Sequence, residues 1–182
     1  MQFTESSTLE LKRQVVDDIR KTVIAFANSE GGTIYIGVDD DGTVVGVKDI
    51  GDEMLRLSNI IRDAIKPDVT MFVSYVQEKE KDKDIIKVTV QKGTECPYYL
   101  QNKGLRPEGV FVRQGASSVP ATESSIRRMI MDTDGDSYEK MRSLNQELTF
   151  DAAIEEFKIR GVPFSGNHLK TLHLVNEDGI YT

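Results

Sequence analysis

The stretch AFANSEGGTIYIGVDDDGTVVG, beginning at Ala25, constrains the fold more than any other part of the chain. The adjacent glycines Gly31 and Gly32 follow a helix-like segment, and either can adopt the left-handed conformation that ends a helix. The next residues, 33–38, are rich in β-branched and aromatic types and predict a strand. Asp41-Gly42 is typical of a hairpin turn, so residues 43–47 are expected to return as a second strand.

Strand alternation makes a further prediction about this hairpin. Ile34, Ile36 and Val38 should share one face of the first strand, and Tyr35 should lie on the other face. The turn accounts for Asp41 but leaves the preceding Asp39 and Asp40 without a clear structural task.

Hydrophobic spacing elsewhere predicts short strands and amphipathic helices in irregular alternation. Thr122 is a good N-cap for the third of these helices. The mixture, with several hairpins, favours an α+β (mixed α/β) sheet flanked by helices over a doubly wound parallel sheet. The predicted strands are 8–12, 69–78, 84–92, 97–100 and 110–113, and the predicted helices are 15–28, 53–65, 123–131 and 149–159.

The length of 182 residues suits one domain with a proper core and the start of another. We expect a first domain at residues 1–131 and an acidic, turn-rich linker at 132–148. Residues 149–182 are then the start of a helical C-terminal region. The last residues stop where a strand is expected to begin, so we expect this region to be truncated and the sequence to be a piece of a longer protein.

Composition and terminal sequence bear on where in the cell the protein is expected. No apolar run approaches the roughly 20 residues that a membrane helix needs, so no membrane partner is expected. The N-terminal residues lack the basic and apolar regions of a secretory signal. The single cysteine, Cys96, allows no internal disulfide and no zinc cluster. Together these features predict a cytoplasmic protein.

The net charge of −7 argues against nucleic-acid binding if the charge is evenly spread, because it would repel phosphate. The distribution is uneven, however. Residues 101–128 carry only two acids, Glu108 and Glu123, against five basic residues. A local basic face on an acidic chain is therefore expected. The five basic residues are Lys103, Arg106, Arg113, Arg127 and Arg128.

Acidic side chains near predicted strand ends form a second candidate site. Glu5 and Glu10 lie before and within the first strand, and Asp39 and Asp40 end a strand that is expected nearby. Converging carboxylates would bind Mg²⁺ or Mn²⁺, which prefer oxygen ligands, and such an ion could activate water. In the structural alternative, Glu5 caps a turn, Glu10 pairs with Lys12 or Arg13, and the aspartates shape the hairpin.

Three ordered motifs point to a family. ESSTLELK, AFANSEGGTIYIGVDDDGTVVGV and GVFVRQGASSVPAT together resemble the Schlafen AlbA-type domain, often labelled a DNA-binding domain. The resemblance covers about residues 3–131, and the middle motif is the most telling. It implies an AlbA-like sheet with hairpins and a role in a transcriptional regulator or helicase-related protein. The sequence has no phosphate-binding loop, so an ATPase reading has no support.

The same resemblance bears on the acidic residues. Some animal Schlafen proteins cut transfer RNA with two glutamates and an aspartate. The matching positions here are Glu5, Glu10 and Asp39, with Asp40 as a weaker match for the aspartate. The resemblance thus implies a metal-dependent nuclease as an alternative function. Those animal enzymes carry two such domains, so a homodimer could supply the second half here.

The leading hypothesis is a nucleic-acid-binding module, with DNA as the expected partner and no required cofactor. The residues expected to contact phosphate are Lys12, Arg13, Lys103, Arg106 and Arg113.

Three alternatives remain open. Arg113 could instead pair with a local carboxylate or carbonyls and hold the QGASS loop. Tyr98 and Tyr99 could stack on unpaired bases or pack in the core. The third possible function is an oligomerising scaffold that binds no nucleic acid.

Overall fold

The computed structural model describes residues 3–134, 143, 145–172, 174–175 and 179–181. Its chain contacts divide into two compact units, Met1–Thr133 and Asp134–Thr182. Part of the expected linker, residues 135–142 and 144, lies outside the described residues.

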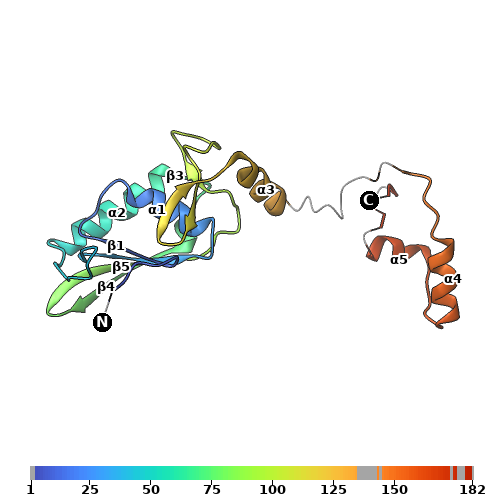
Figure 1. Ribbon diagram of the computed structural model, residues 1–182, viewed down its shortest axis with the longest axis horizontal. Coiled ribbons are helices and arrows are strands. Elements are labelled where there is room, and N and C mark those ends of the chain that lie inside the picture. Colours follow the sequence, from blue (N-terminus) through green and yellow to red (C-terminus); the bar gives the residue numbers. More distant parts are fainter. Residues whose placement is uncertain (1–2, 135–142, 144, 173, 176–178, 182) are drawn as a thin grey trace. The chain divides into compact units, whose positions relative to one another are not determined.

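A mixed four-stranded sheet forms the centre of the first unit (Figure 1). Its spatial order is β1 (Leu9–Lys12), β2 (Gly32–Ile36), β5 (Lys83–Val90) and β4 (Val73–Glu80). β1 and β2 run parallel, whereas β2–β5 and β5–β4 are antiparallel. The chain therefore has the mixed α+β fold that its sequence predicts.

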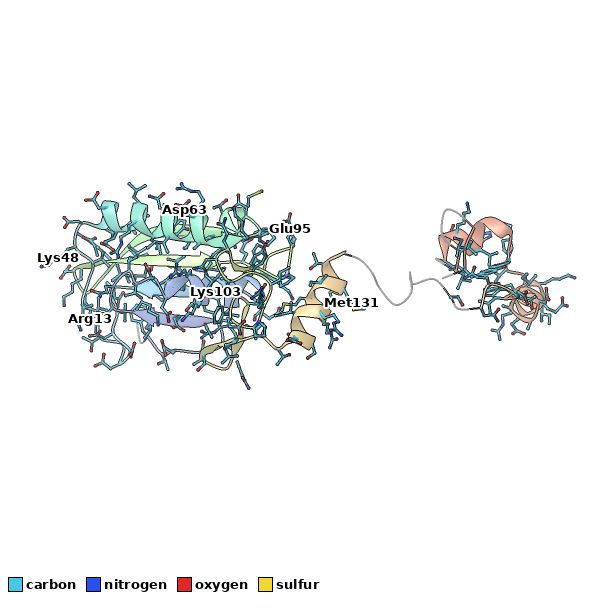
Figure 2. All side chains as sticks on the ribbon, turned by 90° about the horizontal axis from the view of Figure 1, so that it is seen from above. Arg13, Lys48, Asp63, Glu95, Lys103 and Met131 are labelled. Atoms are coloured by element: carbon cyan, nitrogen blue, oxygen red, sulfur yellow. The ribbon has the colours of Figure 1, made fainter. Side chains whose placement is uncertain are left out.

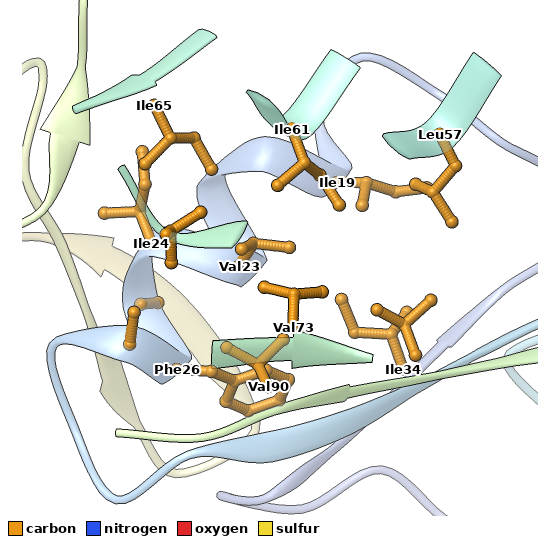
Figure 3. Packing of buried hydrophobic residues seen from close by; sticks show 14 of the residues in the cluster. Ile19, Val23, Ile24, Phe26, Ile34, Leu57, Ile61, Ile65, Val73 and Val90 are labelled. Atoms are coloured by element: carbon orange, nitrogen blue, oxygen red, sulfur yellow. The ribbon is translucent and has the colours of Figure 1, made fainter. Parts of the chain in front are cut away.

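Two helices, α1 (Ile19–Ala27) and α2 (Ile50–Ala64), pack against the sheet through one large apolar cluster (Figure 3). Seven of the nine residues of α1 are buried, whereas α2 buries only the stripe that contains Leu57 and Ile61. The sheet contributes alternate residues such as Ile34 of β2 and Val90 of β5. Burying these side chains is the main driving force for this arrangement.

A smaller cluster lies on the opposite face of the sheet. The ring of Phe3 meets that of Tyr35 edge-on, with 4.8 Å between centroids. Leu11, Val38 and Ile85 complete most of this cluster. The N-terminal segment therefore covers part of the face that carries no helix.

Short strand pairs complete the first unit. β3 (Ile65–Lys66) pairs with β6 (Tyr99–Leu100), and β7 (Phe111–Gln114) pairs with β8 (Ser117–Pro120). The strand β8 was not predicted, because its SSVP residues are not strongly apolar. A short 3-10 turn at Thr70–Phe72 precedes β4, and α3 (Glu123–Asp134) follows β8.

The N-cap prediction for α3 is confirmed. The Ser125 amide donates to Thr122 Oγ1 at 3.1 Å, which satisfies one of the free amides at the helix start.

The second unit contains α4 (Asp151–Ile159) and α5 (Gly166–Thr171). The rings of Phe157 and Phe164 stack with centroids 5.0 Å apart, and Ser165 and His168 form a capping box at the start of α5. The helix predicted at residues 149–159 is thus present. No helix among the described residues is both long and apolar enough to cross a membrane.

The hairpin around Asp41 is present but shorter than predicted. The turn itself is as expected: the Thr43 amide donates to Asp41 Oδ1 at 2.8 Å, and Gly42 has a φ of +82°. Hydrogen bonds from Thr43 also hold the pKa of the Asp41 carboxyl below its usual range. The return segment makes a single bridge, between Val38 and Val44, instead of a full strand.

Gly37 explains why the predicted facing of Val38 is wrong. Its φ is +96°, and its carbonyl accepts hydrogen bonds from both Val45 and Gly46. This bulge interrupts the alternation of side chains. Val38 consequently packs with Tyr35 in the smaller cluster, away from Ile34 and Ile36.

Gly37→Ala tests the bulge. A Cβ at this position would lie 2.9 Å from the Val47 side chain, in a backbone conformation that alanine rarely adopts. We expect the free energy of unfolding to fall by about 1–2 kcal/mol, measured by urea denaturation.

The matched control is Gly51→Ala in α2, where an added Cβ meets no atom within 4 Å. This change should stabilise the protein by about 0.4–1 kcal/mol. Equal effects of the two substitutions would show that the bulge is not required.

Candidate nucleic-acid interface

Arg113 of β7 lies inside the first unit. Only 3% of its side chain is exposed. One terminal nitrogen, Nη1, donates to Glu10 Oε2 at 2.9 Å and to Ser118 Oγ at 3.0 Å. The other, Nη2, donates to the Ser6 carbonyl at 2.7 Å. A guanidinium enclosed in this way cannot reach a phosphate in solution, so the geometry matches the structural alternative for this residue.

Aromatic contact completes the surroundings of this guanidinium. Its central carbon lies 4.8 Å from the ring centroid of Phe26 on α1, within the range of a cation–π interaction. The Arg113 amide also donates to Ser29 Oγ at 3.1 Å. Arg113 therefore ties β7 to the end of α1 as well as to β1.

Glu10 is the acidic partner of this buried site. It lies on β1 with 11% of its side chain exposed. Its Oε1 accepts a hydrogen bond from Lys12 Nζ at 2.5 Å, while Oε2 binds Arg113. Two cations thus compensate one buried carboxylate.

The other predicted metal ligands have separate partners. Glu5 Oε1 accepts a hydrogen bond from the Leu11 amide at 3.2 Å, and Asp39 pairs with Arg13 at 2.6 Å. Asp40 is exposed. Within the described residues, no group of three or more histidine, cysteine, aspartate or glutamate side chains could hold a metal ion. The structure therefore does not bring the predicted ligands together as a metal centre.

Lys103 and Arg106 are both exposed on the loop at residues 101–109 between β6 and β7. Lys103 is labelled in Figure 2. Neither side chain makes an ion pair or hydrogen bond within the described part of the chain. They are the predicted basic residues most available to a ligand.

Backbone hydrogen bonds define the shape of this basic loop. The amides of Lys103 and Gly104 both donate to the Leu100 carbonyl, and those of Gly109 and Val110 donate to the Arg106 carbonyl. The loop is thus a sequence of tight turns with its cations pointing outward. Such order lowers the entropy cost of binding a ligand.

Asn28, at the end of α1, is a positioning residue that was not predicted from the sequence. Its side-chain amide donates to the carbonyls of Tyr98 and Phe111, at 2.9 and 3.0 Å. Its Oδ1 accepts the Tyr98 amide at 2.7 Å. Asn28 therefore holds both chain segments that flank the basic loop. The only sequence signal for this role was an asparagine directly after a helix, and the same pattern equally indicates a simple helix cap.

The two tyrosines before the loop differ in burial. Tyr98 is fully buried, meets Phe72 edge-on and has a raised pKa because burial disfavours its charged form. Tyr99 is half-buried and packs beside the small cluster of Val110 and its neighbours. The packing alternative therefore describes Tyr98.

A groove of about 960 Å³ adjoins the start of the basic loop. It runs between α1 and α2 and is lined partly by Arg20, Arg56 and Asn59, with Gln101 and Asn102 at the loop. Arg20 and Arg56 each have an acidic neighbour, at 3.6 and 3.5 Å. This groove has mixed charge, in contrast to the loop beside it.

The chain is similar to known proteins in both sequence and fold. Residues 5–122 match the family model described as Schlafen, AlbA_2. A crystal structure of the DIP2311 protein from Corynebacterium diphtheriae is similar in fold, with a TM-score of 0.54 and 14% identity. That match covers 97% of this chain but 34% of the other protein, so the chain spans about a third of the length of that relative.

A solution structure of the N-terminal domain of a RecG-related protein from Nitrosomonas europaea also matches. It has a TM-score of 0.45 and 24% identity, over 63% of this chain and 82% of that domain.

Glu10→Gln tests whether the buried ion pair is structural. The substitution removes the charge that compensates Arg113, and breaking a buried pair on one side typically costs about 3–5 kcal/mol. We expect the free energy of unfolding to fall toward the lower end of that range, because the amide oxygen can still accept a hydrogen bond. Urea denaturation measures this change.

Asp39→Asn serves as the control, since it breaks the exposed pair with Arg13, where a change below about 1 kcal/mol is expected. Similar small effects of both substitutions would contradict the structural role of Glu10.

Proposed function

The chain belongs to the Schlafen AlbA_2 family, and from that premise we propose that it is a nucleic-acid-binding module, with DNA as its ligand, in a regulatory protein. The observation that carries the proposal is the pair of exposed, unpaired cations, Lys103 and Arg106, on a loop with defined backbone geometry.

Local charge supports this role despite the acidic chain. Between residues 101 and 122 the only acidic residue is Glu108. Arg113 is internally compensated, so Lys103 and Arg106 dominate the charge that solvent meets at this loop. At physiological salt, potentials are screened over roughly 8 Å, so only acids near the loop weaken this attraction. Three aspartates, Asp17, Asp52 and Asp63, line the adjoining groove.

The chemistry predicts contacts to phosphate more than to bases. Lysine and arginine on a surface loop can bind phosphate oxygens and so position the backbone, but such contacts carry no sequence information. Gln101 and Asn102, at the adjoining groove, supply neutral donors next to the cations. We therefore expect modest sequence preference and strongly salt-dependent binding.

The paired substitution Lys103→Ala/Arg106→Ala tests the proposal. Removing one cation that neutralises a phosphate on duplex DNA should reduce the steepness of log affinity against log salt by about 0.9, hence by about 1.8 for the pair. Fluorescence anisotropy with labelled duplex DNA over a salt series gives this slope, and parallel titrations with single-stranded DNA and RNA compare the ligand classes.

A matched control removes two exposed lysines elsewhere, through Lys48→Ala/Lys81→Ala, on the loop before α2 and at the turn between β4 and β5. It changes the net charge by the same amount and should change the slope little. If both variants weaken binding alike, the attraction is a general charge effect. If neither does, the loop is not the interface.

A further inference from the structure

The two edges of the central sheet differ in whether their outward-facing backbone groups are already hydrogen-bonded. At the β1 edge, local groups occupy the outward-facing backbone. The Leu9 carbonyl accepts the Ser6 amide at 2.9 Å, and the Leu11 amide donates to Glu5 at 3.2 Å. The Leu11 carbonyl accepts Lys12 Nζ at 3.1 Å. This edge is therefore closed to another strand.

Among the described residues, no such groups cover the β4 edge. β4 pairs along all eight of its residues with β5, and no strand lies on its other side within the described part of the chain. The Gln91 amide donates to the Phe72 carbonyl, which fixes which backbone groups face β5. By alternation, the outward-facing amides and carbonyls belong to Val73, Tyr75, Gln77 and Lys79.

The side chains of this strand are unusual for an open edge. Native edges are commonly protected by charges, proline or bulges. Here the charges are confined to the end of β4, from Glu78 onward, and the first five residues, VSYVQ, carry none. Val76, in the middle of the strand, is 50% exposed on the face away from α1 and α2.

We propose that β4 pairs antiparallel with β4 of a second copy, around a two-fold axis at Val76. In this register the outward-facing backbone amide and carbonyl of Tyr75 hydrogen-bond with those of Gln77 in the second copy. Val73 pairs with Lys79 of the second copy in the same way. Each exposed Val76 is then covered by the other. A shift of two residues toward the strand end would leave each Val76 opposite Glu78.

The placement of charges is compatible with the same register. Glu78 lies opposite Ser74 of the second copy, and Lys79 lies opposite Val73, so no like charges face one another. The product is a continuous eight-stranded sheet with blocked β1 edges at both ends, which ends growth at two copies.

Cysteine cross-linking tests the register directly, in a Cys96→Ser background. Opposed residues in a non-hydrogen-bonded antiparallel pair have Cβ atoms roughly 4.5–5.5 Å apart, close enough for a disulfide after slight adjustment. Val76→Cys should therefore give a disulfide-linked dimer under mild oxidation.

Ser74→Cys is the matched control on the same face of β4. Its counterpart in the second copy would be four residues away, or about 13 Å, which is too far to bridge. Cross-linking of Ser74→Cys as readily as Val76→Cys would overturn the proposed register.

Sedimentation of the otherwise unaltered chain provides an independent measurement. Val76→Lys places two like charges at the two-fold axis and should weaken dimerisation by about tenfold or more. Leu105→Lys, at an exposed apolar residue on the basic loop, should leave dimerisation unchanged. A protein that stays monomeric at every concentration, or a dimer that Val76→Lys does not weaken, would overturn the proposal.

Discussion

The buried pair between Glu10 and Arg113 is the interaction on which the arrangement of the first unit depends. A charge removed from water is costly unless it is paired and hydrogen-bonded, so these two side chains restrict where their backbones can lie. Through Arg113, β7 is joined to β1, to the carbonyl of Ser6 and to Phe26 of α1. Three separate parts of the chain thereby meet at one guanidinium.

The buried pair also helps to position the basic loop that we propose as the interface. β7 follows the basic loop directly, and Asn28 holds the segments on both sides of it. The two arginines of GLRPEGVFVRQG thus have different roles. Arg113 is buried in its ion pair with Glu10, whereas Arg106, seven positions earlier, has no such partner and can bind a ligand. An acidic chain can in this way present a small positive surface.

Local sequence signals predicted the local structure well. The Asp41-Gly42 turn, the Thr122 cap and the strand containing Ile34 all depend on neighbouring residues, and all are present. The facing of Val38 was wrong because one glycine conformation reversed the alternation. The partner of Arg113 could not be read from the sequence, since Glu10 lies 103 residues away and only the folded chain brings them together. The pair between Arg13 and Asp39, 26 residues apart, was unpredictable for the same reason, whereas Glu5 binds the amide of Leu11, a local partner.

A double-mutant cycle between Glu10 and Arg113 tests the central claim most directly. The cycle uses Glu10→Ala, Arg113→Met and their combination, with the methionine retaining apolar contact with Phe26. Unfolding free energies from urea denaturation should be strongly non-additive, with a coupling of about 1–3 kcal/mol, because either single change leaves a buried charge less well compensated. Additive effects within about 0.5 kcal/mol would contradict the claim that this pair organises the fold.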